Sequence, residues 1–207
     1  FGVSRDDQDA FAAESQRLAR MAVERDHFRG QIVPVPVPQR RGAPVLVDSD
    51  EHPRPDTTAE SLGSLRPAFR EGGTVTAGNA SGINDGAAAM VVLWEDRAAE
   101  LGVQPMGRIL GYAWTGIAPE IMGFAPVDAI RKALDRAGIG IERVELFEVN
   151  EAFAAQAVAV QRELGIGREV LNVNGGAIAL GHPVGASGAR ILVTLLHEMQ
   201  HREARVG

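Results

Sequence analysis

Apolar side chains recur at helical spacing in the first part of the chain. Phe11, Leu18 and Ala22 fall on one face of a predicted amphipathic helix that runs to about residue 27. Ser4 stands just before this run and is a favourable N-cap, with acidic residues following it in the first turn. The pattern predicts a helix with one buried face.

The next stretch has shorter and less regular patterns. Residues 32–37 alternate Val and Pro, which suits an edge strand or an extended segment. Residues 40–55 are rich in Pro, Asp and Arg and indicate a surface excursion. We expect a short helix at 57–65 and a strand at 74–76. A Gly-rich polar turn follows at 77–86, and the small residues of 75–86 could line a groove.

Residues 87–94 are strongly apolar, and two interpretations remain open. They fit a buried strand or a helix followed by a strand, because periodicity alone does not separate the two. A short helix at 96–101 and a domain junction at 102–107 are expected next.

From residue 108 onward, predicted strands and helices alternate. The strands are expected at 108–116, 144–149 and 170–173, and the helices at 126–137, 150–164 and 184–200. This alternation predicts α/β layering around a sheet.

Composition and charge argue against several classes of function. The net charge of −6 argues against a nucleic-acid or membrane-surface partner. Neither a membrane-spanning apolar run nor a signal-peptide pattern is visible, so we expect a cytoplasmic protein. The 207 residues contain no Cys, which excludes disulfides, thiolate metal sites and a Cys nucleophile within them.

Two segments carry candidate chemistry. Asn150 follows a predicted strand and opens a predicted helix, where α/β proteins place ligands, although it could simply cap that helix. His182 stands in the Gly-rich segment 174–188, whose glycines allow close approach of a ligand; an incidental surface His is the alternative.

A third pattern matches H-E-x-x-H, the zinc-protease motif, at residues 197–201. Only six residues follow His201, which leaves little room for a third ligand. We therefore expect a polar, frayed helix end here and no metal site.

Three segments together resemble the thiolases: residues 150–153 (NEAF), 181–188 (GHPVGASG) and 76–88 (TAGNASGINDGAA). The likeness is strongest to the acetyl-CoA acetyltransferases and 3-ketoacyl-CoA thiolases. It implies an α/β fold, the layered α/β/α/β/α arrangement of that family. Residues 1–97 would be the rest of an N-terminal domain, with a loop-domain portion at about 28–70, and residues 104–207 a C-terminal domain without its last strands.

The resemblance also implies a function. Thiolases are acyl-CoA C-acyltransferases that catalyse reversible Claisen condensation or thiolysis of acetoacetyl-CoA or another 3-oxoacyl-CoA. A whole thiolase is about twice as long, and its two catalytic Cys would lie outside this chain, so we expect a fragment that is inactive alone. Its missing half would cover residues 87–94 and the helix through Phe11. The alternative is a non-catalytic relative that binds acyl-CoA or a partner protein.

By resemblance, His182 would be the base for the nucleophilic thiol and a donor to the developing oxyanion, while Asn150 would hold a water and Glu151 would support the loop. No cofactor is implied beyond the coenzyme A thioester substrates, and a homodimer or homotetramer is expected. The implied coenzyme A contacts are Arg54 at the nucleotide, Ser61 at the adenine, Phe69 nearby, Ala77 and Ser81 at the pantetheine arm, Met122 at the acyl pocket and Phe153 in the pantetheine tunnel. Composition alone favours a solvated arginine in a Pro-rich loop as the interpretation of Arg54.

Overall fold

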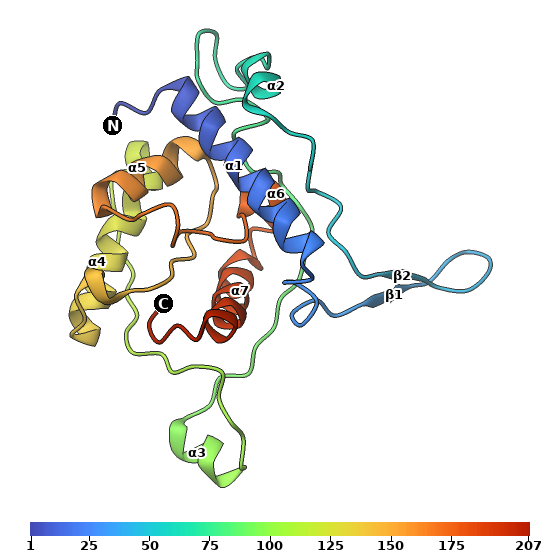
Figure 1. Cartoon of the computed structure of the whole chain (residues 1–207), viewed down its shortest axis with the longest axis vertical. Helices are drawn as coiled ribbons and strands as arrows, with labels where there is room; N and C mark the ends of the chain where they lie inside the picture. The colour runs from blue at the N-terminus through green and yellow to red at the C-terminus, as the bar shows by residue number, and fades with distance from the viewer.

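Helix α1 (Arg5–Glu24) runs across the body of the molecule in the computed structural model, which describes residues 1–207 (Figure 1). Ser4 caps it as predicted: its Oγ accepts the Asp7 N–H at 3.1 Å, and the Asp7 carboxylate accepts the Ser4 N–H at 2.9 Å. This reciprocal pairing satisfies orphan amides at the helix start. The predicted first helix is confirmed, with its end at Glu24.

The main core forms where three elements pack on α1. These are α2 (Ala59–Gly63), α5 (Ala154–Leu164) and the short α6 (Ala177–Leu180). Alanines such as Ala12 and Ala157 lie in the contact, so the helix backbones approach closely. The buried cluster is Phe11, Ala12, Leu62, Ala154, Ala157, Val158, Ile166, Leu171 and Ile178.

The remaining helices surround this core. The 3₁₀ turn η1 (Pro119–Phe124) leads into α4 (Ala125–Ala137), which lies beside α5; the turn η2 (Ile141–Arg143) follows. Helix α7 (Ser187–Arg202) ends near the C-terminus, and α3 (Glu95–Glu100) projects from the body (Figure 1). All predicted helices are found, but α5 begins at Ala154 rather than at residue 150, and α7 at Ser187 rather than at residue 184.

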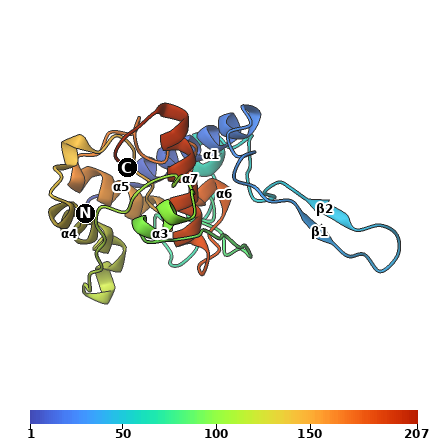
Figure 2. The same ribbon diagram turned by 90° about the horizontal axis from the view of Figure 1, so that it is seen from below.

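One regular β-ladder is present. Strand β1 (Val35–Val37) pairs antiparallel with β2 (Val45–Val47), so that Val35 lies opposite Val47. The pair forms an arm that projects well away from the body (Figure 2). All six strand residues are exposed, which confirms the extended segment and the surface excursion; the second strand was not predicted.

The predicted sheet strands mostly lack partners, and residues 170–173 are mainly turn, with Asn172 at a φ of +45°. Residues 144–149 and 170–173 meet through a single parallel bridge, in which the Phe147 N–H donates to Val170 O at 2.8 Å. Residues 74–76 likewise form only one bridge, between Thr76 and Pro67. Residues 108–116 belong to no ladder. A strand needs a neighbour for its amides, and these 207 residues provide few.

The prediction of a strand, or of a helix followed by a strand, at residues 87–94 is wrong, whereas the expectation that these residues are exposed without the half that would cover them is confirmed. Val91 is 86% and Trp94 87% exposed, and the segment has no regular structure. The expectation of an exposed Phe11 face is wrong too, since Phe11 is 6% exposed and packs in the main core. The large exposed apolar side chains of the two unpartnered segments are Val91, Val92, Leu93, Trp94, Ile109, Leu110, Tyr112 and Trp114.

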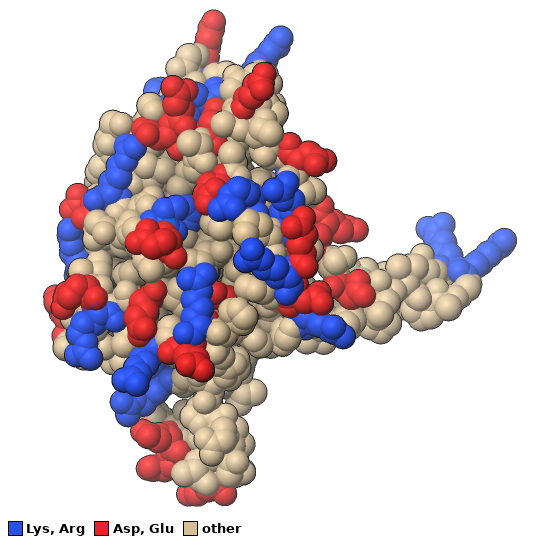
Figure 3. Space-filling view, viewed as in Figure 1, with Lys and Arg blue, Asp and Glu red and all other residues tan.

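Charges of both signs are interspersed over the face shown in Figure 3. Arg40 and Arg41 lie between β1 and β2, at the tip of the arm. None of the helices combines the length and the apolar character needed to cross a membrane. The cytoplasmic location stays a prediction.

The exposed apolar segments should make the isolated chain self-associate, because apolar surface of this extent drives association in water. Val92→Lys with Trp94→Lys should lower the association in sedimentation velocity runs over a concentration series. Ser49→Lys, in an exposed loop away from these segments, is the charge control. A monomer at all concentrations, or an equal effect of the control, would contradict this account.

Candidate active site

His182 lies in the Gly-rich turn between α6 and α7, and its backbone is fixed by a second segment. Its N–H donates to Asn84 Oδ1 at 3.0 Å, and residues Ile83 and His182 form a parallel bridge. Gly181 has a φ of +93°, and a Cβ there would lie 2.7 Å from the same Asn84 oxygen. Glycine is therefore required just before His182 for this close approach.

The two ring nitrogens of His182 have different partners. Nδ1 lies 2.6 Å from Ser187 Oγ, whose hydroxyl donates to Pro183 O at 3.1 Å. Ser187 therefore accepts from an Nδ1–H, which assigns the tautomer by its hydrogen bonds. Nε2 then keeps its lone pair and faces Asn150 Nδ2 at 3.3 Å. A half-buried imidazole with a free Nε2 lone pair can act as a general base.

Asn150 is not a helix cap, because the N-cap of α5 is Phe153. The interpretation of Asn150 as a cap is therefore wrong. Its backbone is positioned by Asn172, whose amide accepts the Val149 N–H at 2.8 Å and donates to Val149 O at 2.7 Å. The Oδ1 of Asn150 is buried without a partner. A free acceptor beside an imidazole is a suitable place for a bound water.

Glu151 is the buried connection between the segments around the site. Its side chain is fully buried and accepts three hydrogen bonds. The donors are Ser15 Oγ at 2.6 Å, Asn172 Nδ2 at 2.9 Å and the Ile178 N–H at 3.3 Å. A Cβ on Gly176 would overlap the Glu151 carboxylate, so a glycine is needed there as well. The carboxylate thus joins α1, the loop at Asn172 and the start of α6.

The entry into α5 pairs with the predicted Gly-rich turn. Ser81 donates its N–H and its Oγ–H to Ala152 O, at 3.1 and 3.0 Å. Ala80 and Phe153 form an antiparallel bridge, and the ring of Phe153 meets that of Phe69 edge-on at 6.0 Å. The structure therefore brings together three of the predicted site residues, Phe69, Ser81 and Phe153.

The other predicted binding residues lie outside the cluster of Phe69, Ser81 and Phe153. Arg54 is exposed; its backbone N–H donates to Gln16 Oε1 at 2.9 Å. Ser61 takes part in the capping box of α2 with Thr58. Met122 lies on η1 and is 69% exposed, and Ala77 is also exposed. Their roles in binding stay predictions.

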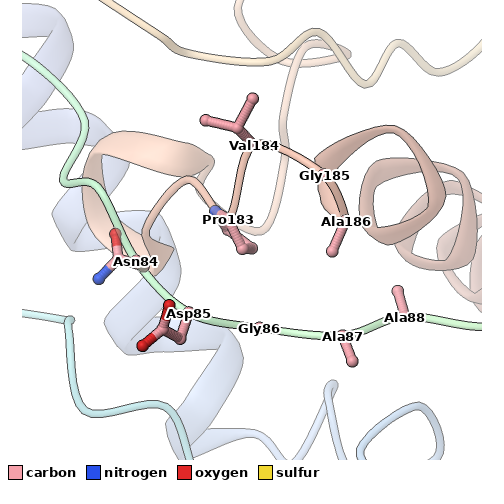
Figure 4. Close-up of a pocket in the computed structure, with 9 residues that line it drawn as sticks. All are labelled: Asn84, Asp85, Gly86, Ala87, Ala88, Pro183, Val184, Gly185 and Ala186. Atoms are coloured by element: carbon pink, nitrogen blue, oxygen red, sulfur yellow. The ribbon is translucent and has the colours of Figure 1, made fainter.

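A pocket of about 450 Å³ opens at the turn that follows His182, although the His182 side chain does not line it. Two chain segments face each other across it, one from the end of the Gly-rich turn and one from the turn before α7 (Figure 4). The expected groove at 75–86 is found in part, since its last three residues line this pocket. The lining residues are Asn84, Asp85, Gly86, Ala87, Ala88, Pro183, Val184, Gly185 and Ala186.

The H-E-x-x-H residues are used differently from a zinc site. Glu198 is 4% exposed, which corrects the expected frayed, solvated helix end. It accepts from Asn174 Nδ2 at 2.7 Å and pairs with Arg202. The His201 ring packs against that of His27 at 4.6 Å. No group of three or more His, Cys, Asp or Glu in the chain is placed to hold a metal ion.

Glu151→Ala should destabilise the chain by about 3–5 kcal/mol, because three buried donors lose their acceptor and a void is left. Denaturant unfolding followed by circular dichroism measures the change. Glu142→Ala, on an exposed turn, is the matched control. A loss below about 1 kcal/mol for Glu151→Ala would remove the assigned role of its carboxylate.

The chain matches two family models, the thiolase N-terminal domain over residues 1–96 and the thiolase C-terminal domain over residues 103–207. It is 58% identical to an acetyl-CoA acetyltransferase of Chromobacterium violaceum and 56% identical to one of Pseudomonas aeruginosa. Each match covers 100% of this chain and 53% of the relative.

Solved structures show the same likeness. The acetyl-CoA acetyltransferase of Bacillus anthracis superposes with a TM-score of 0.94 at 50% identity, covering 97% of this chain and 51% of that one. Human mitochondrial 3-ketoacyl-CoA thiolase in complex with CoA gives 0.88 at 43% identity, covering 98% and 50%. These values confirm the layered α/β fold expected from the motifs, and the chain spans about half the length of the curated relatives it matches. With both family models matched in order along its length, the chain belongs to the thiolase family.

Proposed function

We propose that this chain carries part of the active site of an acyl-CoA C-acyltransferase. The reaction would be the reversible Claisen condensation or thiolysis of acetoacetyl-CoA or another 3-oxoacyl-CoA. The observation that carries this proposal is the approach of His182 Nε2 to Asn150 Nδ2, at 3.3 Å, beside an open pocket of small residues.

His182 would act first as a base. Its Nε2 takes the proton of a thiol, and the thiolate attacks the carbonyl carbon of an acyl-CoA to form an acyl thioester, with CoA as the leaving thiol. The chain contains no Cys, so this nucleophile must come from residues outside these 207. The 450 Å³ pocket at His182 is the space in which we place the reacting thioester.

His182 and Asn150 would act together in the condensation step. A base from outside these 207 residues takes an α-proton from a second acetyl-CoA, and the resulting enolate attacks the acyl thioester and releases the nucleophilic thiolate. The enolate carries negative charge on its thioester oxygen, and that charge needs donors. His182 would be one donor in its other tautomer, with the proton on Nε2 and with the Ser187 hydroxyl turned to donate to Nδ1. A water bound at Asn150 is the other, and the free, buried Oδ1 of Asn150 gives that water a hydrogen-bond acceptor.

The substrate would be held as a coenzyme A thioester, without a further cofactor. The cluster of Phe69, Ser81 and Phe153 supports a pantetheine site, because two aromatic faces and a hydroxyl converge there. Human mitochondrial 3-ketoacyl-CoA thiolase, a structural relative, has been solved with CoA. In this proposal Arg54 contacts the nucleotide phosphates, Ser61 the adenine, Ala77 the pantetheine and Met122 the acyl group.

We also propose that the protein works as a homodimer or homotetramer. The β1–β2 arm supports self-association, because its valines are exposed on a projection that packs on nothing in its own chain. Such an arm gains stability when a second copy covers it.

A non-catalytic acyl-CoA-binding protein is the second candidate. The absence of Cys favours it for the 207-residue chain considered by itself. Both candidates keep the pantetheine cluster, so they differ in turnover and not in CoA binding.

The 207-residue chain alone should show no thiolysis of acetoacetyl-CoA, since it has no thiol to carry the acyl group. Calorimetry should still detect CoA binding, because the assigned contacts lie within the chain. Thiolysis by a homogeneous 22.0 kDa sample would contradict the assignment of the chemistry.

Transplanting residues 1–207 into the Chromobacterium violaceum enzyme, in place of the matching segment, should give an active chimera. In that chimera His182→Ala should lower kcat about 10²–10³-fold with little change in CoA affinity, because a base and an oxyanion donor are lost together. Asn150→Ala should slow condensation more than acyl transfer. His197→Ala, which changes a histidine outside the site, is the control.

An inactive chimera that folds and binds CoA would overturn the proposed function. Activity of the His182→Ala chimera within threefold of the parent would remove His182 from the mechanism. Equal losses in both half-reactions for Asn150→Ala would contradict its assignment to the water.

A further inference from the structure

The segment that contains Asn84 lies directly on the turn that carries His182, and two glycines allow this close approach. A Cβ on Gly181 would lie 2.7 Å from Asn84 Oδ1. A Cβ on Gly86 would lie 2.9 Å from Pro183 Cγ, further along the same contact. Both distances are too short for real Cβ atoms, so a side chain at either glycine would push the two segments apart.

The Asn84 side chain is what ties these two segments together. The His182 N–H donates to Asn84 Oδ1 at 3.0 Å. A main-chain N–H can only donate, so the amide oxygen must be the atom that faces it. Ile83 forms the parallel bridge with His182, but its side chain is 97% exposed and therefore adds no packing to the contact. Most of the hold on the turn at this point comes from the Asn84 amide.

Ser187 and Asn84 hold His182 in different ways. The hydroxyl of Ser187 contacts the imidazole at Nδ1 and donates to Pro183 O, so it fixes the ring within its own turn. Asn84 belongs to the opposite segment and also lines the 450 Å³ pocket in which we place the reacting thioester. The position of the imidazole relative to that pocket wall therefore depends on Asn84.

We propose that Asn84 is a positioning residue for His182, an inference that rests on the proposed function. Asn84 acts through the main-chain N–H and not through the ring, so its role is the same whichever ring nitrogen carries the proton. Both proposed uses of His182, as a base and as an oxyanion donor, depend on it equally. A displacement of a reacting group by about 1 Å can cost about 10²-fold in rate.

The first test uses the active chimera. Asn84→Leu removes the acceptor and should lower the rates of acyl transfer and of condensation by the same factor, about tenfold, with KM for acetyl-CoA within about threefold. Asn84→Asp keeps an oxygen acceptor for the His182 N–H and should restore both rates to within about threefold of the parent. Gln104→Glu, which adds a charge in an exposed loop, is the control and should follow the parent.

Three results in the chimera would overturn the proposal. A change confined to KM would make Asn84 a wall of the pocket and nothing more. Clearly unequal losses in the two half-reactions, of the kind expected for Asn150→Ala, would show that Asn84 does not act through the placement of His182. An Asn84→Asp chimera as slow as Asn84→Leu would show that the acceptor is not what matters.

A second measurement separates this inference from the proposed function. In the 207-residue chain carrying Val92→Lys and Trp94→Lys, amide hydrogen exchange at His182 should be slow with Asn84 or with Asn84→Asp. It should be about tenfold faster with Asn84→Leu, because the N–H has lost its acceptor. Protection of the Phe147 N–H, which donates to Val170 O at 2.8 Å, shows that the rest of the chain is folded.

Gly86→Ala reaches the same contact without changing Asn84. Its methyl group would lie 2.9 Å from Pro183 Cγ, so the segments must separate and exchange at His182 should again become faster. Gly116→Ala, whose Cβ would meet no atom within 4 Å, is the matched control. If the chimera is inactive, or if Asn84→Leu does not fold, Gly86→Ala still decides the positioning role. Unchanged exchange at His182 in folded Asn84→Leu or Gly86→Ala chains would contradict it.

Discussion

The structure depends on one buried carboxylate. Glu151 accepts hydrogen bonds from α1, from the loop at Asn172 and from the first turn of α6, which are far apart in the sequence. Its neighbour Asn150 and the turn that carries His182 are held by these same segments. Three charge-assisted hydrogen bonds in a dry site are stronger than neutral ones, but removal of the carboxylate would leave all the donors unpaired. The placement of Asn150 relative to His182 therefore depends on the hydrogen bonds of the Glu151 carboxylate.

A second constraint is that the helices of this chain are packed on one another, whereas its sheet segments lack neighbouring strands. The helices bury their apolar faces on one another within residues 1–207, so that Phe11 and Ala154 lie in a closed core. The sheet segments cannot do the same, since a strand needs neighbours on both sides to satisfy its amides. Residues 87–94 and 108–116 are therefore extended and exposed, whereas 144–149 and 170–173 share one bridge. The site lies where the closed helical part meets this open part.

The sequence predicted the helices well because their apolar periodicity and caps are local. It misplaced the start of α5, because residues 152–154 pair with residues 79–81 and Val149 pairs with Asn172, contacts that no local pattern reveals. Strands at 87–94 and 108–116 were predicted from apolar runs. An apolar run is a local pattern and does not show whether the chain contains a neighbouring strand to pair with it. The motifs identified Asn150 and His182. They did not identify Asn84 or Asn172, because single polar residues in apolar or Gly-rich surroundings give no distinctive spacing.

The central claim is that the Glu151 carboxylate holds the two active-site segments together, and amide hydrogen exchange at Ile178 tests it most directly. Its N–H donates to the carboxylate at 3.3 Å, and the neighbouring Gly176 N–H donates to Ser15 Oγ at 3.0 Å, which is itself bonded to Glu151. Both amides should be strongly protected in the parent chain and exchange faster together in Glu151→Gln, while the amides in the middle of α5 stay protected. Unchanged protection at Ile178 and Gly176 in a folded Glu151→Gln chain would contradict the claim.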